Sequence, residues 1–469
     1  MTTAVLRFIL NRREWLRIGL GGLGLSWLPA PQAPGANQRQ APGFGKARSV
    51  ILVYASGGQS QLDMWDPKPQ APLDVRGQFS AISTAVPGVH VCEHLPRIAQ
   101  LADRYTIIRS MSHEDLDHGS ATYLALTGRY HNRKSSNPIP SASDYPTYGS
   151  VLTKVRRSNR FLYEAVHVNA PALVPTTISA GQDAGFLGRE FEPLVVGDVS
   201  REAVAIPGLS ANDQLPPLRL AARRSLKDSL DAYREQLANN GESIEMSQLY
   251  QRAFEMLSAP RYRAAFDLNA EPERLRDRYG RHRSGQACLL ARRLVEAGVP
   301  WVTVVWNHSN RGQDKEPNNT ELYGWDTHND IFSALKDHLL PRFDESFAAL
   351  LEDLEDRGLL DDTLVVCMGE FGRAPRVAFE DRFAGGTPGR KHWPSVYSIV
   401  AAGAGVSRGA VLGASDRLGG EPASQRYGPW DIAATMFSAL GVDPAGHYQD
   451  SLQRPFPVTV GRVMEELYG

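Results

Sequence analysis

Short apolar runs alternate with segments of helical character along almost the whole of this 469-residue sequence. Residues 49–55, 301–306 and 363–368 are apolar runs of the length typical of buried strands. Residues 331–357 have the periodicity of a long amphipathic helix. Strands that alternate with helices predict an α/β fold with a mostly parallel sheet and helices on both faces. We expect the mostly helical stretch at about 205–298 to be an insertion in this domain.

Polar clusters end several of these runs or open the helices that follow them. They lie at 118–128, 324–328, 370–373 and 391–394, and they are rich in His, Asp and Glu. In an α/β sheet, such positions from distant parts of the chain converge on one crevice. Histidine and carboxylate groups are common ligands of divalent metal ions. The clusters therefore predict a metal-dependent hydrolase site.

The composition narrows the class of protein. An apolar content of 42% and a charged content of 22% are those of a soluble globular protein. With a formal net charge of −1, nothing in the charge balance points to nucleic acid or to an anionic membrane. Three cysteines in so long a chain are not a disulfide framework. We expect Cys367, which lies inside an apolar run, to be a small core residue.

The N-terminal segment differs from the rest of the chain. It contains the twin arginine Arg12-Arg13, and residues 18–30 are apolar and carry no charge. These thirteen residues are too few to span a membrane, which takes about 20. A basic region, a short apolar region and an Ala/Pro end are typical of a twin-arginine export signal. A buried N-terminal helix is the alternative, but the four glycines of the run disfavour a helix.

We therefore expect the chain to use the twin-arginine export machinery and to be periplasmic or extracellular, without a stable membrane span. Residues 1–30 would be the signal, and the Pro-, Gly- and Gln-rich residues 31–46 a disordered tether before a domain at 47–469. The mature protein should begin between about residues 30 and 45. This route generally carries proteins that have folded and often hold a cofactor, which suits a metal site.

The last third of the chain resembles sulfatases and other members of the alkaline phosphatase superfamily. In those enzymes a helix leads through Gly and an Asp-Asp-Thr-like turn into an apolar strand that ends at a metal-binding Asp, and residues 355–372 are similar. Residues 431–441 resemble the sulfatase Asp-Ile-Ala-Pro-Thr helix, and 118–128 resemble the sulfatase nucleophile segment. The resemblance implies an alkaline phosphatase/sulfatase-like three-layer sandwich, a divalent metal ion, and a phosphate or sulfate ester as substrate.

Nearly the whole chain after residue 46 resembles more closely the family called domain of unknown function 1501. The shared motifs are Gly-Gly-x-Ser-x-Leu-Asp-x-Trp-Asp at 57–66, Trp-Asp-Thr-His at 325–328, Glu-Phe-Gly-Arg at 370–373 and His-Trp-Pro at 392–394. Together these motifs are specific, although no single one of them is.

Departures from the superfamily pattern concern one metal ligand and the nucleophile. Ser56 occupies the place of the metal-binding Asp after the first strand. Asp63 is either a substitute metal ligand or an acid that caps the turn before Pro67. His118 stands at the nucleophile position, where it would act as a nucleophile or as an extra metal ligand. Ser120 could supply a hydroxyl group for catalysis, or it caps the helix.

Asp326 and His328 are two residues apart, so in an extended loop both point to the same side and suit one divalent ion. Otherwise Asp326 caps the helix that begins near Ile331.

The resemblance implies further roles near residues 370 and 392. Glu370 corresponds to the metal-binding Asp of sulfatases. Arg373 follows Glu370 closely, and its guanidinium chemistry suits bidentate binding of an anionic oxygen; otherwise it forms an ion pair with Glu370. His392 corresponds to a metal-binding His of phosphatases, and Lys391 to an anion-contacting Lys of sulfatases. Both could instead be surface loop residues.

We therefore expect a metal-dependent hydrolase that acts on an anionic ester or glycan. Zinc or manganese suits histidine ligands better than calcium does. The alternative is a catalytically inactive member of the fold that serves as an extracytoplasmic binding or structural protein, and the lost hydroxyl or thiol nucleophile favours it. In either case one pocket at the carboxyl edge of the sheet should hold five groups: His118, Asp326, His328, Glu370 and His392.

Overall fold

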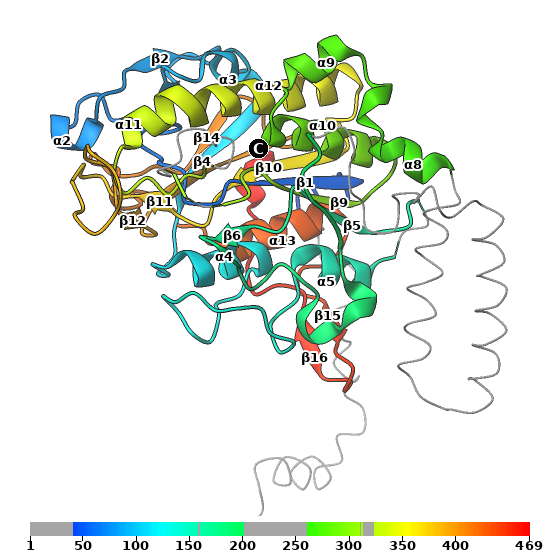
Figure 1. Cartoon of the computed structure of the whole chain (residues 1–469). Helices are drawn as coiled ribbons and strands as arrows, with labels where there is room; N and C mark the ends of the chain where they lie inside the picture. The colour runs from blue at the N-terminus through cyan, green and yellow to red at the C-terminus, as the bar shows by residue number, and fades with distance from the viewer. Residues whose placement is uncertain (1–40, 158–159, 201–259, 310, 313–322) are drawn as a thin grey trace, which may run out of the picture. The chain divides into compact units, whose positions relative to one another are not determined.

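The computed structural model describes residues 41–157, 160–200, 260–309, 311–312 and 323–469. Within these residues, eight strands form one sheet in the order β14-β4-β13-β10-β1-β9-β5-β8 (Figure 1). The strands are β1 (Ser49–Tyr54), β4 (Tyr105–Met111), β5 (Ala165–Val168), β8 (Leu194–Val196), β9 (Trp301–Val305), β10 (Thr363–Met368), β13 (Tyr397–Ala402) and β14 (Ala410–Leu412).

In this sheet β13 runs antiparallel to both of its neighbours, and every other neighbouring pair is parallel. The predicted α/β class with a mostly parallel sheet is therefore confirmed. The antiparallel direction of β13 has a consequence for the site. The start of β13 lies at the edge where the other strands end, so residues just before β13 meet residues that follow β1, β4 and β10.

The central strands are apolar because both of their faces are covered. All six residues of β1 and all six of β10 are buried. Successive side chains of a strand point to opposite faces, so Ile51 and Val53 enter one core cluster while Val50 and Leu52 enter another. Strands buried on both faces show continuous apolar runs rather than alternation, which is why the sequence pattern located them.

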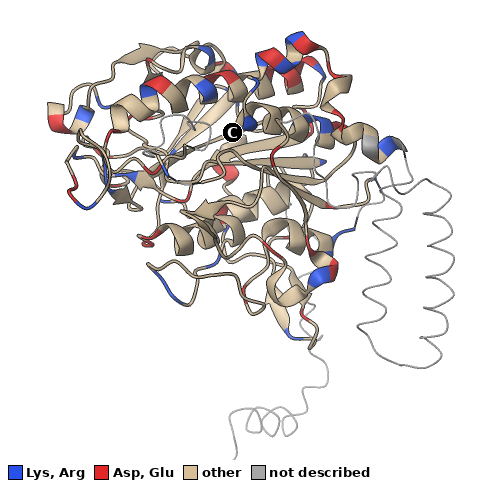
Figure 2. Cartoon of the chain, in the orientation of Figure 1, with Lys and Arg blue, Asp and Glu red and all other residues tan. Residues whose placement is uncertain are grey.

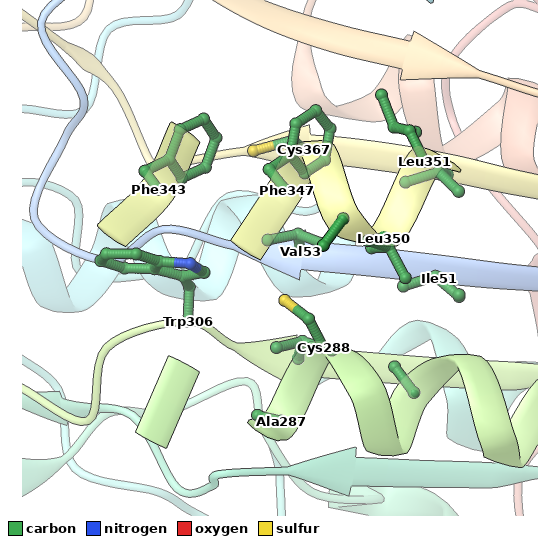
Figure 3. Packing of buried hydrophobic residues seen from close by; sticks show 14 of the residues in the cluster. Ile51, Val53, Ala287, Cys288, Trp306, Phe343, Phe347, Leu350, Leu351 and Cys367 are labelled. Atoms are coloured by element: carbon green, nitrogen blue, oxygen red, sulfur yellow. The ribbon is translucent and has the colours of Figure 1, made fainter. Parts of the chain in front are cut away.

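Helices α3 (Pro96–Gln100), α10 (Arg283–Glu296) and α12 (Leu340–Asp356) pack on one face of the sheet (Figure 1). Figure 3 shows Cys288 of α10 and Phe347 of α12 packed around Val53 and Cys367 of the sheet. Both cysteines are free and buried, so Cys367 is the core residue that its position predicts. Acidic and basic residues are frequent in α12 and in α9 (Glu273–Arg278) of this layer (Figure 2).

Helices α4 (His118–Thr127), α5 (Tyr148–Val155) and α13 (Pro429–Ala439) pack on the other face (Figure 1). The predicted three layers are therefore present. The shorter described elements are α2 (Leu73–Arg76), α8 (Pro260–Phe266), α11 (Ile331–Ala334), and the strand pairs β2 (Ala81–Ser83) with β3 (His90–Cys92), β6 (Leu173–Val174) with β7 (Thr177–Ile178), β11 (Gly372–Arg373) with β12 (His392–Trp393), and β15 (His447–Gln449) with β16 (Pro455–Pro457).

The helix predicted for 331–357 contains a π-helical turn, Leu335–Leu339, between α11 and α12. Pro341 explains this turn. Proline has no N–H to donate, and its ring would clash with the carbonyl group of residue 337 in a regular α-helix. A π-helical turn relieves the clash at this point of the helix.

The predicted insertion at about 205–298 extends too far at its C-terminal end, because α10 is part of the sandwich itself and packs on β1, β5 and β9. Residues 201–259 lie outside the described part of the chain, as do the predicted signal and residues 31–40 of the predicted tether. Residues 41–46 belong to the fold, since Gly45 N–H donates to the carbonyl oxygen of Ser438 over 2.9 Å. Among the described helices, none combines the length and the apolar character that crossing a membrane requires.

Candidate metal centre

Four side chains converge at the carboxyl edge of the sheet: His118, Asp326, His328 and His392. One nitrogen or oxygen atom from each lies within 4.8 Å of all the others. Oδ1 of Asp326 lies 3.2, 3.1 and 3.4 Å from the Nε2 atoms of His118, His328 and His392, respectively. The Nε2 atoms of His328 and His392 are 2.9 Å apart. Imidazole nitrogens and a carboxylate oxygen are the donor set of zinc and related ions.

The topology of the sheet explains why these four residues meet. His118 is the first residue of α4, which follows β4. Asp326 and His328 lie in the connection between β9 and α11. His392 lies in β12, just before β13. Because β13 is antiparallel to β4 and β10, its start brings His392 to the edge at which the parallel strands end.

Each of the three histidines has an acceptor oxygen near its Nδ1 atom. Nδ1 of His118 lies 2.6 Å from Oε1 of Glu370. Nδ1 of His392 donates to the carbonyl oxygen of Leu116 over 2.7 Å. Nδ1 of His328 lies 3.3 Å from Oε2 of Glu380. This arrangement directs all three Nε2 atoms to one point, and metal-binding histidines in proteins are commonly oriented in this way.

The charges of the four groups are coupled. Burial lowers the pKa of His118, but the carboxylates of Asp326 and Glu370 raise it by more, to about 9. Burial raises the pKa of Asp326, yet His118 and Arg373 hold it well below its usual value. Burial and the charge of His118 lower the pKa of His392 to about 3. A proton on His118 and a metal ion would therefore compete for the same Nε2 atom.

The residues fit a metal ion. Nε2 of His118 is buried and makes no well-directed hydrogen bond, although Oδ1 of Asp326 is 3.2 Å away. A buried polar nitrogen without such a bond costs free energy. A cation among the four groups would satisfy this nitrogen and would pair with the Asp326 carboxylate.

Glu370 lies behind His118 and is not one of the four converging groups. Its carboxylate has no exposed surface, and it accepts from Gly57 N–H over 2.8 Å and from the Tyr54 hydroxyl over 3.1 Å. These contacts, together with the contact to His118, engage both of its oxygens. Glu370, expected to be a direct metal ligand, instead contacts Nδ1 of His118 from outside the group of four. Phe371 packs beside the rings of His118 and His392, at centroid distances of 4.9 and 4.7 Å.

Arg373 is fully buried and contacts Asp326 rather than Glu370. Its Nη2 lies 2.8 Å from Oδ1 of Asp326 and also donates to the carbonyl oxygen of Gly57. Nε donates to the carbonyl oxygen of Gly58 over 3.1 Å. The guanidinium is thus already paired, and it stabilises the ionised form of Asp326 rather than being presented to a substrate.

Asp63 is not brought to the cluster. Its side chain has no exposed surface and forms a two-pronged ion pair with Arg390, at 2.7 and 3.1 Å. The Ser60 hydroxyl donates to it over 2.5 Å. The expectation that Asp63 replaces the missing metal ligand is therefore wrong, because a buried arginine far away in the sequence occupies its carboxylate.

The Ser120 hydroxyl lies outside the four-group cluster and does not cap the helix. Its hydroxyl donates to Oδ1 of the buried Asp115 over 2.6 Å and accepts from Ser136 N–H over 3.2 Å. The helix N-cap is Asp117, without a side-chain capping bond. The loop at 135–138 accepts hydrogen bonds from the first amides of α4. Gly119 N–H donates to Asn137 Oδ1 over 2.8 Å, and Ser120 N–H donates to the carbonyl oxygen of residue 136 over 2.9 Å.

A model of the family described as "Protein of unknown function (DUF1501)" matches residues 47–468. The chain belongs to the DUF1501 family. The resemblance inferred from the motifs at 57–66, 325–328, 370–373 and 392–394 is thereby confirmed.

The DUF1501 chain is also similar to solved structures of hydrolases. They include a phosphonate monoester hydrolase from Silicibacter pomeroyi, with 13% identity, 90% of this chain and 77% of that chain covered, and a TM-score of 0.40. A sulfatase from Pseudoalteromonas sp. has 16% identity, coverages of 86% and 68%, and a TM-score of 0.36. Alkaline phosphatase from the Antarctic bacterium TAB5 has 11% identity, coverages of 78% and 94%, and a TM-score of 0.33. No curated protein sequence matched the chain.

Two residues complete the surroundings of the site in this DUF1501 protein. Lys391, expected to contact an anion, has a side chain that is 60% exposed, and its Nζ lies 3.2 Å from Oε1 of Glu380. Glu380 also faces His328, and the sequence pattern did not identify it. It lies in an irregular loop without periodicity, so the sequence carries no signal for its role.

Proposed function

We propose that this protein binds a divalent transition-metal ion through His118, Asp326, His328 and His392. The observation that carries the proposal is the convergence of three Nε2 atoms and one Oδ1 atom, with an acceptor oxygen near each Nδ1. Zinc or manganese fits this donor set better than calcium, because calcium prefers shells made entirely of oxygen.

We further propose that the bound ion serves the hydrolysis of an anionic ester, a phosphate or a sulfate, carried on a small molecule or a glycan. The four groups bring one negative charge when their histidines are neutral, so a divalent ion leaves the centre positive and favours an anionic ligand. When bound, such an ion supplies Lewis-acid chemistry toward an ester oxygen. Glu370 and Arg373 hold His118 and Asp326 in place. The motifs shared with sulfatases support this class of substrate.

A specific observation favours a second candidate, an extracytoplasmic protein that binds the metal or an anionic glycan without turnover. Among the described residues, no cysteine belongs to the cluster, and the Ser120 hydroxyl is bonded to Asp115. The start of α4 is likewise occupied by Ser136 and Asn137. The serine of the segment that resembles the sulfatase nucleophile loop is therefore already engaged by Asp115 and by Ser136 N–H, which favours binding without turnover.

One experiment separates the two candidates. Purified protein, loaded in turn with zinc or manganese, is assayed with chromogenic phosphate and sulfate esters beside an Asp326→Ala/His328→Ala variant. The hydrolase proposal expects turnover by the wild type with at least one ester class and none by the variant. Metal binding without turnover of any ester would contradict the hydrolase proposal and favour the second candidate, the binding protein. The same rate in both proteins would contradict a reaction at this site.

We also propose export by the twin-arginine route to the periplasm or the cell exterior. The proposal rests on Arg12-Arg13, on the short uncharged apolar run after them, and on the three free cysteines. A metal site built from segments far apart in the sequence forms only in the folded chain, which suits a route that carries folded proteins.

A further inference from the structure

The loop between Ala378 and Gly389 covers one side of the proposed metal centre. Its two ends are joined, because Ala378 and Gly389 exchange backbone hydrogen bonds of 2.9 and 3.0 Å. From this loop, Phe383 stacks on the His328 ring with a centroid distance of 3.7 Å and an interplanar angle of 7°. Glu380 approaches the edge of the same ring, with Oε2 at 3.3 Å from Nδ1.

We infer that Glu380 is a positioning residue of the metal centre, which holds the His328 ring with its Nε2 atom toward Asp326 and His392. This inference rests on the metal site proposed above. Phe383 fixes the plane of the ring. Oε2 of Glu380 lies 3.3 Å from Nδ1 without a well-directed hydrogen bond, and its charge favours a proton on Nδ1, which leaves Nε2 free for a metal.

The backbone of Glu380 is fastened to the residue that follows His328. The Asn329 side chain accepts from Glu380 N–H over 3.0 Å and donates to the Glu380 carbonyl oxygen over 2.9 Å. Both backbone groups of Glu380 are therefore held by a neighbour of the histidine that it faces. Asp330 adds a second fastening, since its carboxylate accepts from Gly386 N–H and Thr387 N–H.

Glu380 also pairs with two exposed side chains. Lys391 and Arg382 lie 3.2 and 3.3 Å from its carboxylate, but their side chains are 60% and 76% exposed, whereas that of Glu380 is 5% exposed. Exposed ion pairs contribute little to stability. The buried partner of this carboxylate is His328, whose side chain is 3% exposed.

The test compares wild-type protein with Glu380→Ala and Glu380→Gln. Glu421→Ala is the matched control, because Glu421 forms an exposed ion pair with Arg426 at 3.7 Å. Zinc affinity is measured by competition with a chelating dye after thermal melting has shown that each variant is folded. We expect Glu380→Ala to bind zinc about 10–100-fold more weakly, Glu380→Gln to recover much of the loss because its amide oxygen still accepts, and Glu421→Ala to match the wild type.

A second measurement does not depend on metal. Nitrogen NMR of labelled, chelator-treated protein at one alkaline pH reports whether the His328 proton lies on Nδ1. We expect a protonated Nδ1 in the wild type and in Glu380→Gln, and its loss in Glu380→Ala. Unchanged His328 signals in Glu380→Ala, with zinc affinity equal to that of the wild type, would overturn the inference. If the wild type binds no zinc, the proposed function fails, and the NMR result alone decides the role of Glu380.

Discussion

Nδ1 of His118 lies 2.6 Å from Oε1 of Glu370, a carboxylate with no exposed surface. Glu370 follows β10 and His118 opens α4, so this contact joins the sheet to the helix that carries the histidine. It also fixes which His118 nitrogen faces Asp326. The proposed centre therefore depends on a residue outside its four ligands.

Replacing Glu370 with alanine should weaken both the fold and the metal site. Tyr54, Gly57 and His118 would each lose a buried acceptor. We expect the free energy of unfolding to fall by about 3 kcal/mol and zinc affinity to fall about 10–100-fold. Urea denaturation and zinc titration measure the two effects. An unchanged affinity in a folded Glu370→Ala protein would argue against its positioning role.

Asp63→Asn separates the structural role of Asp63 from the role of a ligand. Breaking its buried pair with Arg390 should lower the free energy of unfolding by about 3 kcal/mol. The zinc content at saturation should stay that of the wild type, because Asp63 is bound to Arg390 and lies outside the cluster. Asp74→Asn, in an exposed pair with Arg376, is the control and should cost less than about 1 kcal/mol. Loss of zinc in Asp63→Asn would restore Asp63 as a ligand.

The stability of the fold should depend on the protonation of Glu192. Burial raises its pKa from 4.5 to about 7, and the carboxylate of Asp183 adds to the effect. Because the pKa is higher in the folded state, the folded state binds this proton more tightly than the unfolded state does. The resulting stabilisation is complete at pH values below the unfolded pKa, and it is lost as the pH rises through about 7.

Glu192→Gln should remove this dependence. As the pH rises from about 4.5 to about 8, the free energy of unfolding of the variant, relative to that of the wild type, should increase by about 1 kcal/mol. This value allows for the partial exposure of Glu192. Chemical denaturation at several pH values measures the difference between the two proteins. A difference that stays constant with pH would show that Glu192 does not titrate in this range.

Lysine at both Arg12 and Arg13 should block export, because the twin-arginine route reads the guanidinium pair rather than the charge alone. Fractionation of cells followed by immunoblotting measures the periplasmic or secreted share. A single Lys46→Arg change, after the signal, serves as the control. Normal export of the Arg12→Lys/Arg13→Lys protein would contradict the proposal that this segment is a twin-arginine signal.

The sequence located the strands wherever burial on both faces made them continuously apolar. The run at 363–368 coincides with β10 because all six of its residues are buried. No sequence pattern marked β14, because its apolar run of three residues is very short and only half-buried. Local patterns thus identified the central strands and missed this one short edge strand.

The four converging groups could be predicted because each lies where an element begins or ends at one edge of the sheet. Asp63 and Ser120 could not be assigned in this way. Their partners, Arg390 and Asp115, are ordinary loop residues, and only the folded chain shows that they are buried beside them. Glu380 escaped prediction for the same reason.

The most direct test of the metal centre is elemental analysis of protein purified without chelator. The wild type is compared with Asp326→Ala/His328→Ala and with His447→Ala, a histidine that lies exposed in β15. A single four-group site predicts about one equivalent of zinc or manganese in the wild type and in His447→Ala, and none in the double variant. Equal, substoichiometric metal in all three proteins would contradict the site.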